Sequence, residues 1–170
     1  HGGFCHALCS AWEAEALKAE ALGIRVCLIR TGLVVGPQGG FLKDLIRPFS
    51  LGLGGRLGSG QQWMSWIHLD DEIGIIKYLL DHPSARGAFN LTAPNPVTNE
   101  AFTASLAACL HRPAWLNLPA GLLKLILGER AELLLESAKI LPHRVEALGY
   151  RFIQPELNAA LKATLNPPAA

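Results

Sequence analysis

The sequence predicts an α/β fold, because helical and strand patterns alternate along most of the chain. Residues 4–22 carry apolar side chains at three- and four-residue spacing, which indicates a helix, and Gly23 is a natural end for it. The β-branched run 24–30 then predicts a strand that is buried on both faces. A helix, a glycine and a buried strand in this order form one arm of an α/β crossover.

A second helix and a glycine loop follow. Residues 31–37 end in a Gly-Pro turn, and residues 39–51 predict a helix that is broken near Pro48. Five glycines lie within residues 52–60. A loop with so few side chains keeps a fixed shape only when neighbouring segments pack against it. The order of residues is neither that of a P-loop nor that of a dinucleotide fingerprint. We therefore expect a mobile lid, the alternative being a rigid turn packed for close backbone approach.

The middle of the chain predicts two further strands, each followed by a helix. Residues 66–69 form the first strand, and Asp70 is well placed to cap a helix over residues 71–81. Residues 87–92 form the second strand, and residues 98–110 form a helix that is opened by its threonine.

The character of the sequence changes at Pro113. A leucine-rich helical stretch covers residues 121–140 and is interrupted near Gly128. Its apolar residues cover much of the helix surface, so this stretch is buried or lies at an interface. A small helix over residues 141–149 and a closing helix over residues 155–165 follow.

Length and composition fit a folded domain with a sizeable core. Of the 170 residues, 50% are hydrophobic and 17% are charged, which excludes a disordered chain. The net charge of +1 provides no field that would recruit nucleic acid or an anionic membrane. No run approaches the roughly 18 apolar residues that span a bilayer. We therefore expect a small molecule as the partner, rather than nucleic acid or a membrane.

The cysteines indicate reduced thiols in a cytoplasmic protein. Cys5, Cys9, Cys27 and Cys109 form no CxxC pair and lie in apolar segments. Together with His6, the first two could form half of a metal site, but no second ligand pair follows at zinc spacing. We expect small buried hydrophobic side chains and no metal.

Aromatic and amide side chains follow the glycine loop directly. Trp63 and Trp66 flank Ser65, and Gln62 precedes them. Two indoles beside a loop can stack on a flat ligand, or they can form an aromatic cluster in the core. The residues alone leave both interpretations open.

His68 and Asp70 could form a general base with its orienting carboxylate. The alternative is a histidine satisfied in the core beside a helix cap, and we assign both residues mainly to structure. No GxSxG elbow and no HExxH motif occur. Arg30 ends an apolar strand, so we expect its guanidinium to meet a carboxylate or carbonyls near the sheet edge, with Asp70 or Asp71 as a candidate partner.

Three segments resemble a known family. Residues 30–37, RTGLVVGP, resemble the segment after the sixth strand of extended short-chain dehydrogenase/reductases. Residues 60–71, GQQWMSWIHLDD, resemble the GxQxRDFIHVDD segment of sugar-nucleotide epimerases. With TAPNPVT at residues 92–98, they resemble the atypical short-chain dehydrogenases known as epimerase family proteins or nucleoside-diphosphate sugar epimerases. The resemblance extends over residues 4–165.

The resemblance implies an architecture and a cofactor. Residues 1–112 would be the C-terminal portion of a Rossmann-like NAD(P)-binding domain, and residues 113–170 a small, mostly helical C-terminal domain that binds substrate. In the family, a glycine-rich turn and a stretch with a catalytic tyrosine lie before the point where this sequence begins. The chain therefore resembles the C-terminal half of a longer protein. We expect NAD(P) to bind that protein, and no dinucleotide to bind tightly to this chain alone.

The resemblance also implies site residues. Those expected to flank the nicotinamide are Thr31, Gly32, Leu33 and Val34. Those expected to line the substrate cleft are Gln62, Trp63, Ser65 and Trp66. It implies no metal ligand, and no catalytic residue is assigned.

One departure from the family pattern concerns the substrate. Met64 and Ser65 stand where sugar-nucleotide epimerases have the arginine and aspartate of GxQxRD. A methionine cannot supply the N–H donors with which arginine contacts a diphosphate. The expected function is the substrate-binding half of an NAD(P)-dependent epimerase or oxidoreductase acting on a sugar nucleotide or another small polar substrate.

Two other classes of function stay open on the sequence. One is a non-catalytic module that holds a nucleotide or a protein on a Rossmann-like fold. The other is an interaction domain that forms a homodimer through the leucine-rich residues 122–135.

Overall fold

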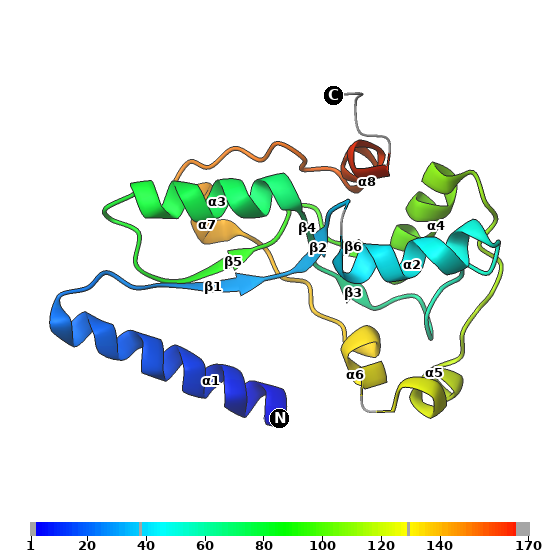
Figure 1. Cartoon of the computed structure of the whole chain (residues 1–170), viewed down its shortest axis with the longest axis horizontal. Coiled ribbons are helices and arrows are strands. Elements are labelled where there is room, and N and C mark those ends of the chain that lie inside the picture. Colours follow the sequence, from blue (N-terminus) through cyan, green and yellow to red (C-terminus); the bar gives the residue numbers. More distant parts are fainter. Residues whose placement is uncertain (1–2, 38, 129, 166–170) are drawn as a thin grey trace.

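The computed structural model describes residues 3–37, 39–128 and 130–165 as an α/β arrangement, which confirms the predicted fold class (Figure 1). In chain order the elements are α1 (Phe4–Leu17), the 3-10 helix η1 (Lys18–Leu22), β1 (Cys27–Thr31), β2 (Leu33–Val35), α2 (Gly40–Ser50), β3 (Trp63–Met64), β4 (Trp66–His68), α3 (Leu69–Asp81), β5 (Gly87–Leu91), β6 (Val97–Thr98), α4 (Asn99–Leu110), α5 (Ala120–Leu127), α6 (Arg130–Leu135), α7 (His143–Ala147) and α8 (Leu157–Leu165).

The strands form three short pairs. β1 pairs with β5 in parallel, from Cys27 opposite Gly87 to Thr31 opposite Leu91. β2 pairs with β4 in parallel, and β3 pairs with β6 antiparallel. The chain therefore changes its partner strand between β1 and β2, at Gly32. The sequence predicted no strand at β2, because this short segment reads as the exit from β1.

Helix α1 is tied to β1 by an ion pair. It begins as predicted, and Gly23 ends the following 3-10 turn in the left-handed region, with φ of 76°. The Arg30 guanidinium donates to both carboxylate oxygens of Glu13, each at 2.7 Å. The expected carboxylate partner therefore exists, but it is Glu13 and not Asp70 or Asp71.

The expectation that β1 is buried on both faces is wrong. Ile29 is 43% exposed, and Arg30 and Thr31 are also exposed. Within the described residues β1 pairs along one edge only, and α1 contributes no buried side chain to cover it. For the same reason Cys5 and Cys9, which we expected to be buried, are exposed on α1.

Helix α2 continues through Pro48, although we expected a break there. Proline removes one backbone donor and crowds the preceding turn, but Pro48 lies in the last turn of this helix. Leu42 and Phe49 are buried in the same core cluster, so packing fixes the helix on both sides of the proline.

The glycine loop between α2 and β3 is a packed turn, which favours the rigid alternative, and the mobile lid stays a prediction. Gly54 and Gly55 are buried, and a Cβ atom on Gly55 would lie 1.2 Å from the carbonyl oxygen of Leu116. The Leu118 N–H donates to the Arg56 carbonyl, and the Gly58 N–H donates to the Leu118 carbonyl. The glycines therefore permit two backbone segments to meet.

Helix α3 is capped by His68 rather than by Asp70. The imidazole Nδ1 of His68 accepts the Asp70 N–H at 3.2 Å. Asp71 is fully buried and accepts the backbone N–H groups of Ile153 and Gln154 at 2.7 and 2.8 Å. Helix α4 begins as predicted, since the hydroxyl of Thr98 caps it.

The leucine-rich stretch forms two short helices, α5 and α6, and the chain from 136 to 140 is extended where we expected a helix. Hydrogen bonds to the β3–β4 region hold this extended segment, as described below. No helix within the described ranges has both the length and the apolar character required to cross a bilayer.

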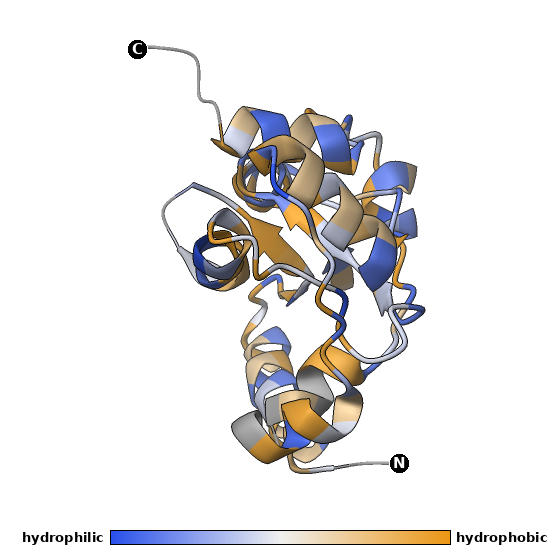
Figure 2. Cartoon of the chain, turned by 90° about the vertical axis from the view of Figure 1, so that its right-hand side faces the viewer, coloured by the Kyte–Doolittle hydropathy of each residue, from blue (hydrophilic) through white to orange (hydrophobic). Residues whose placement is uncertain are grey.

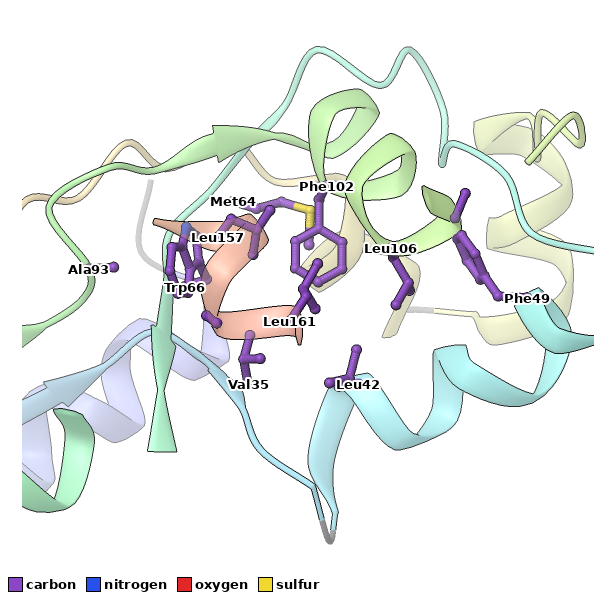
Figure 3. Packing of buried hydrophobic residues seen from close by; sticks show 12 residues of the cluster. Val35, Leu42, Phe49, Met64, Trp66, Ala93, Phe102, Leu106, Leu157 and Leu161 are labelled. Atoms are coloured by element: carbon purple, nitrogen blue, oxygen red, sulfur yellow. The ribbon is translucent and has the colours of Figure 1, made fainter. Parts of the chain in front are cut away.

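Two clusters of buried side chains form most of the core. In Figure 2 an orange, hydrophobic strand lies at the centre between helices of mixed colour. The first cluster joins α2, α4 and α8 to β2–β4 and includes Val35, Leu42, Phe49, Met64, Trp66, Phe102, Leu106, Leu157 and Leu161 (Figure 3). The second lies under α3 and α7 and includes Ile67, Ile75, Leu79, Phe89, Leu91 and Val145. The C-terminal helices thus complete the core of the strands.

The packed glycine loop leads to a stability prediction. Gly55→Ala forces a methyl group onto the Leu116 backbone, so we expect the free energy of unfolding to fall by roughly 2–3 kcal/mol. Chemical denaturation measures the change. Gly121→Ala is the matched control, because a Cβ atom there meets nothing within 4 Å. Equal stability of the two variants would contradict the packed loop.

Candidate functional site

A cavity of about 250 Å³ lies where β1 ends and β2 begins. Thr31, Gly32 and Leu33 form one part of its wall, and Trp63 and Ser65 form another part. In open α/β sheets, ligands bind outside the carboxyl ends of parallel strands. This cavity is therefore the candidate ligand site.

Gly32 allows these two parts of the wall to approach each other. Its N–H donates to the Leu91 carbonyl at 3.0 Å, and the next N–H, of Leu33, donates to the Ser65 carbonyl at 2.8 Å. A Cβ atom on Gly32 would lie 2.6 Å from the Ser65 carbonyl oxygen and 3.0 Å from Thr92. Only a residue without a side chain fits at this position without moving the strands.

Thr31 connects the cavity to a buried carboxyl group. Its hydroxyl donates to one oxygen of Glu72 at 2.8 Å. Within the described part of the chain, the other oxygen of Glu72 is buried without a hydrogen-bond partner. Burial raises the pKa of Glu72, and the Thr31 hydrogen bond opposes that shift.

The extended segment 136–140 closes the cavity on a third side, and Ser65 holds it there. The Ser65 hydroxyl donates to the Ala138 carbonyl at 2.7 Å and accepts the Ile140 N–H at 2.9 Å. The Trp63 N–H donates to the Ser137 hydroxyl at 3.0 Å. Residues more than seventy positions apart in the sequence thus share one wall.

Several cavity residues were not predicted from the sequence. Phe41, Glu136 and Ile140 all line the cavity. Glu136 and Ile140 belong to the stretch that we expected to be helical, and no motif marks them. The amphipathic pattern of α2 places Phe41 next to the core, but nothing in that pattern points to a ligand.

The predicted site residues separate into two groups. Those that line the cavity are Thr31, Gly32, Leu33, Trp63 and Ser65. Those outside the lining are Val34, Gln62 and Trp66. Val34 packs against the second core cluster. The Gln62 amide donates to the Leu57 carbonyl at 2.9 Å, and the fully buried Trp66 donates its indole N–H to the Asn95 carbonyl at 3.0 Å.

Met64 belongs to the core as well as to the cavity wall. It is 7% exposed and contacts Asn99, whose amide nitrogen lies 3.4 Å from the sulfur. The Asn99 oxygen already accepts the Leu57 N–H at 2.8 Å. An arginine at this position would bring a charge into a nearly buried site, so these surroundings suit the neutral methionine.

The remaining candidate groups are structural. His68 is buried and lies beside Asp70 at 3.6 Å, as a helix cap. Tyr150 donates to Asp71, and Tyr78 donates to the Leu148 carbonyl, so both tyrosines face α3 and α7 rather than the cavity. Across residues 3–37, 39–128 and 130–165, no three His, Cys, Asp or Glu side chains gather as metal ligands. All four cysteines are free thiols.

Comparison with known families gives two matches. Residues 5–92 match the NAD dependent epimerase/dehydratase family. Residues 118–164 match a domain of unknown function, DUF1731. The chain is 46% identical over 158 residues to an epimerase family protein SDR39U1 homolog, chloroplastic, of Arabidopsis thaliana, which covers 93% of this chain and 45% of that protein. It is 42% identical over 151 residues to epimerase family protein MW0731 of Staphylococcus aureus, covering 89% and 50%.

Solved structures show the same fold. Human epimerase family protein SDR39U1, crystallised with NADPH, aligns at a TM-score of 0.80 with 39% identity, over 88% of this chain and 54% of that one. The nucleoside-diphosphate sugar epimerase of Corynebacterium glutamicum aligns at 0.77 with 31% identity, over 96% and 31%. The chain thus spans about half the length of the curated relatives that it matches.

The hydrogen bonds of Ser65 lead to a prediction about the 136–140 segment. Ser65→Ala leaves the Ile140 N–H and the Ala138 carbonyl without their partner, so we expect a loss of about 1–3 kcal/mol in unfolding free energy. Hydrogen exchange at the Ile140 amide will accelerate. Ser84→Ala, at an exposed serine, is the control and leaves both quantities unchanged. Unaltered exchange at Ile140 in Ser65→Ala would show that the hydroxyl does not hold the segment.

The raised pKa of Glu72 predicts a pH dependence of stability. In the folded state the Glu72 carboxyl stays protonated at pH values above 4.5, its ordinary pKa. The stabilisation by this proton is therefore complete below pH 4.5 and is lost as the pH rises through the folded-state pKa. Glu72→Gln cannot ionise, so we expect a smaller drop in unfolding free energy between acid and neutral pH. Denaturation curves at both pH values measure it. The exposed Glu20→Gln is the control, and a drop as large as in the parent chain would refute the assignment.

Proposed function

Because the chain belongs to the NAD-dependent epimerase/dehydratase family, we propose that it forms the substrate-binding part of an NAD(P)-dependent epimerase or oxidoreductase-like protein. One observation carries the proposal. The cavity lies at the carboxyl end of β1, where a nucleotide-binding α/β fold accepts its ligand. Its walls combine a closely packed glycine, two hydroxyl groups and an aromatic face. Such a wall suits a small polar molecule with a flat or apolar part.

The residues at the β1–β2 junction fit the nicotinamide end of the cofactor. Thr31, Gly32 and Leu33 present backbone, a hydroxyl and an apolar side chain to the cavity, and none of them carries a charge. Nicotinamide is a flat, amide-bearing ring, which these groups can accommodate. We propose that these three residues flank it, and that Val34 supports them from the core side. When bound, NAD(P) supplies a hydride acceptor or donor.

On the other part of the wall, Trp63 and Ser65 are the proposed substrate-facing residues. Gln62 and Trp66, which the sequence also suggested, act from behind the wall. Their hydrogen bonds to the Leu57 and Asn95 carbonyls fix the backbone that carries Trp63 and Ser65. We assign no catalytic acid or base, and we propose a sugar nucleotide or another small polar molecule as the substrate.

We also propose the division of the chain into residues 1–112 and 113–170. The second portion supplies Glu136 and Ile140 to the cavity, while the first supplies the strands. The segment after Tyr150 is anchored to Asp71 by two backbone hydrogen bonds. The C-terminal portion therefore acts as a wall of the site that is fastened to the first portion at two places, Ser65 and Asp71.

A nicotinamide titration tests the proposed function. We expect nicotinamide mononucleotide to bind the 170-residue chain weakly and to shift the backbone amide signals of Gly32 and Leu33 in NMR spectra. We expect NADPH to bind more weakly than a micromolar dissociation constant, because the described cavity lining offers no cluster of N–H donors for a pyrophosphate.

The reference signals are those of α8, which lies outside the cavity. If the α8 signals shift as much as the Gly32 signal, the proposal that nicotinamide binds at Gly32 and Leu33 is wrong. A micromolar NADPH dissociation constant would show that the chain holds a pyrophosphate site elsewhere.

A further inference from the structure

The cavity wall is mostly apolar and carries one ionisable side chain among its described residues. Its apolar members are Leu33, Phe41, Leu57, Trp63, Met64 and Ile140. The ionisable member is Glu136. Arginine, lysine and histidine are missing from the described lining, so the charge that a ligand meets there is negative.

Three neutral polar side chains of the wall are already engaged. The Ser65 hydroxyl is bonded to the 136–140 segment, and the Thr31 hydroxyl donates to Glu72. Asn99 accepts the Leu57 N–H. Among the side chains that the structure describes, Glu136 forms no hydrogen bond or ion pair, and the indole N–H of Trp63 forms no hydrogen bond either. The Glu136 carboxylate is therefore available to a ligand that donates a proton in a hydrogen bond.

A cation beside a lining residue is held against an aromatic face. The Lys139 ammonium lies 4.3 Å from the centroid of the Trp63 ring and does not line the cavity. A cation over an indole is stabilised by the ring itself. Phosphate recognition normally uses arginine forks or several converging N–H donors, and this wall offers a carboxylate instead.

We propose that this cavity takes a small, flat molecule that is uncharged or cationic and that carries an N–H or O–H donor for Glu136, with its ring against Trp63, and that it excludes nucleoside diphosphates. This proposal rests on the proposed function and narrows its substrate class. The volume of about 250 Å³ supports it, because sites for larger ligands usually exceed about 300 Å³. A diphosphate beside the exposed carboxylate of Glu136 would place like charges close together.

A pair of probes of similar shape and opposite charge tests the proposal. Phenethylamine and 3-phenylpropionate each carry one ring and one charged end, and UDP-glucose represents the nucleoside diphosphates. The readout is the indole N–H signal of Trp63 in NMR spectra of the 170-residue chain. We expect phenethylamine to shift this signal at lower concentration than 3-phenylpropionate, and UDP-glucose to leave it unchanged.

Variants identify the responsible group. Glu136→Gln should weaken phenethylamine binding by up to about fivefold, the value for a partly exposed ion pair, and should remove the preference over 3-phenylpropionate. Glu146→Gln is the matched control, since this glutamate lies on α7 outside the cavity. Its preference for the amine should equal that of the parent chain.

Three outcomes would overturn the proposal: no shift of Trp63 with phenethylamine, a shift with UDP-glucose at similar concentration, or an unchanged preference in Glu136→Gln. The proposed function fails separately, when nicotinamide mononucleotide leaves Gly32 and Leu33 unshifted. If nicotinamide mononucleotide shifts the Gly32 and Leu33 amide signals but UDP-glucose shifts the Trp63 signal more readily than phenethylamine, the proposed function stands and the proposed substrate class is wrong.

Discussion

The site depends on the close approach of backbone at Gly32. At this residue the chain stops pairing with β5 and begins to pair with β4. The Gly32 N–H donates to the Leu91 carbonyl, and the Leu33 N–H donates to the Ser65 carbonyl. Because strands that change partner diverge, a space opens beside the change, and the cavity occupies it. The position of Gly32 is therefore fixed by sterics on one side and by hydrogen bonds on the other, and these constraints also position Thr31 and Leu33.

The other part of the cavity wall depends on two contacts between distant parts of the sequence. Ser65 holds the 136–140 segment, and Asp71 holds the chain at Ile153. Both anchors lie next to β4, so one short strand organises the cavity and the C-terminal portion together. A buried carboxylate such as Asp71 is tolerated because three donors satisfy it, two backbone N–H groups and the Tyr150 hydroxyl. The small helices of the C-terminal portion thus need no large core of their own.

Local signals in the sequence predicted the elements that local physics determines. The α4 helix begins at the Thr98 cap because hydroxyl capping involves only neighbouring residues. The fold class and the family followed from strand and helix order and from the motif around Trp66. The packed glycine loop and the extended 136–140 segment were missed, since each depends on contacts with residues far along the chain. The exposure of Ile29 was missed because, within the described residues, β1 pairs along one edge only. The cavity residue Glu136 was missed because it, too, is placed by contacts with residues far along the chain.

The two tryptophans lie on either side of a break between β3 and β4, and they have different surroundings. Trp63 and Trp66 are three residues apart, and Ser65 interrupts the strand between them. Trp66 enters the core and is fully buried, whereas Trp63 stays partly exposed and lines the cavity. The sequence could not distinguish a core aromatic cluster from a ligand-stacking pair, because one tryptophan enters the core and the other lines the cavity. The break at Ser65 also turns its hydroxyl toward the 136–140 segment, and this brings the carboxylate of Glu136 and the indole of Trp63 to the same cavity.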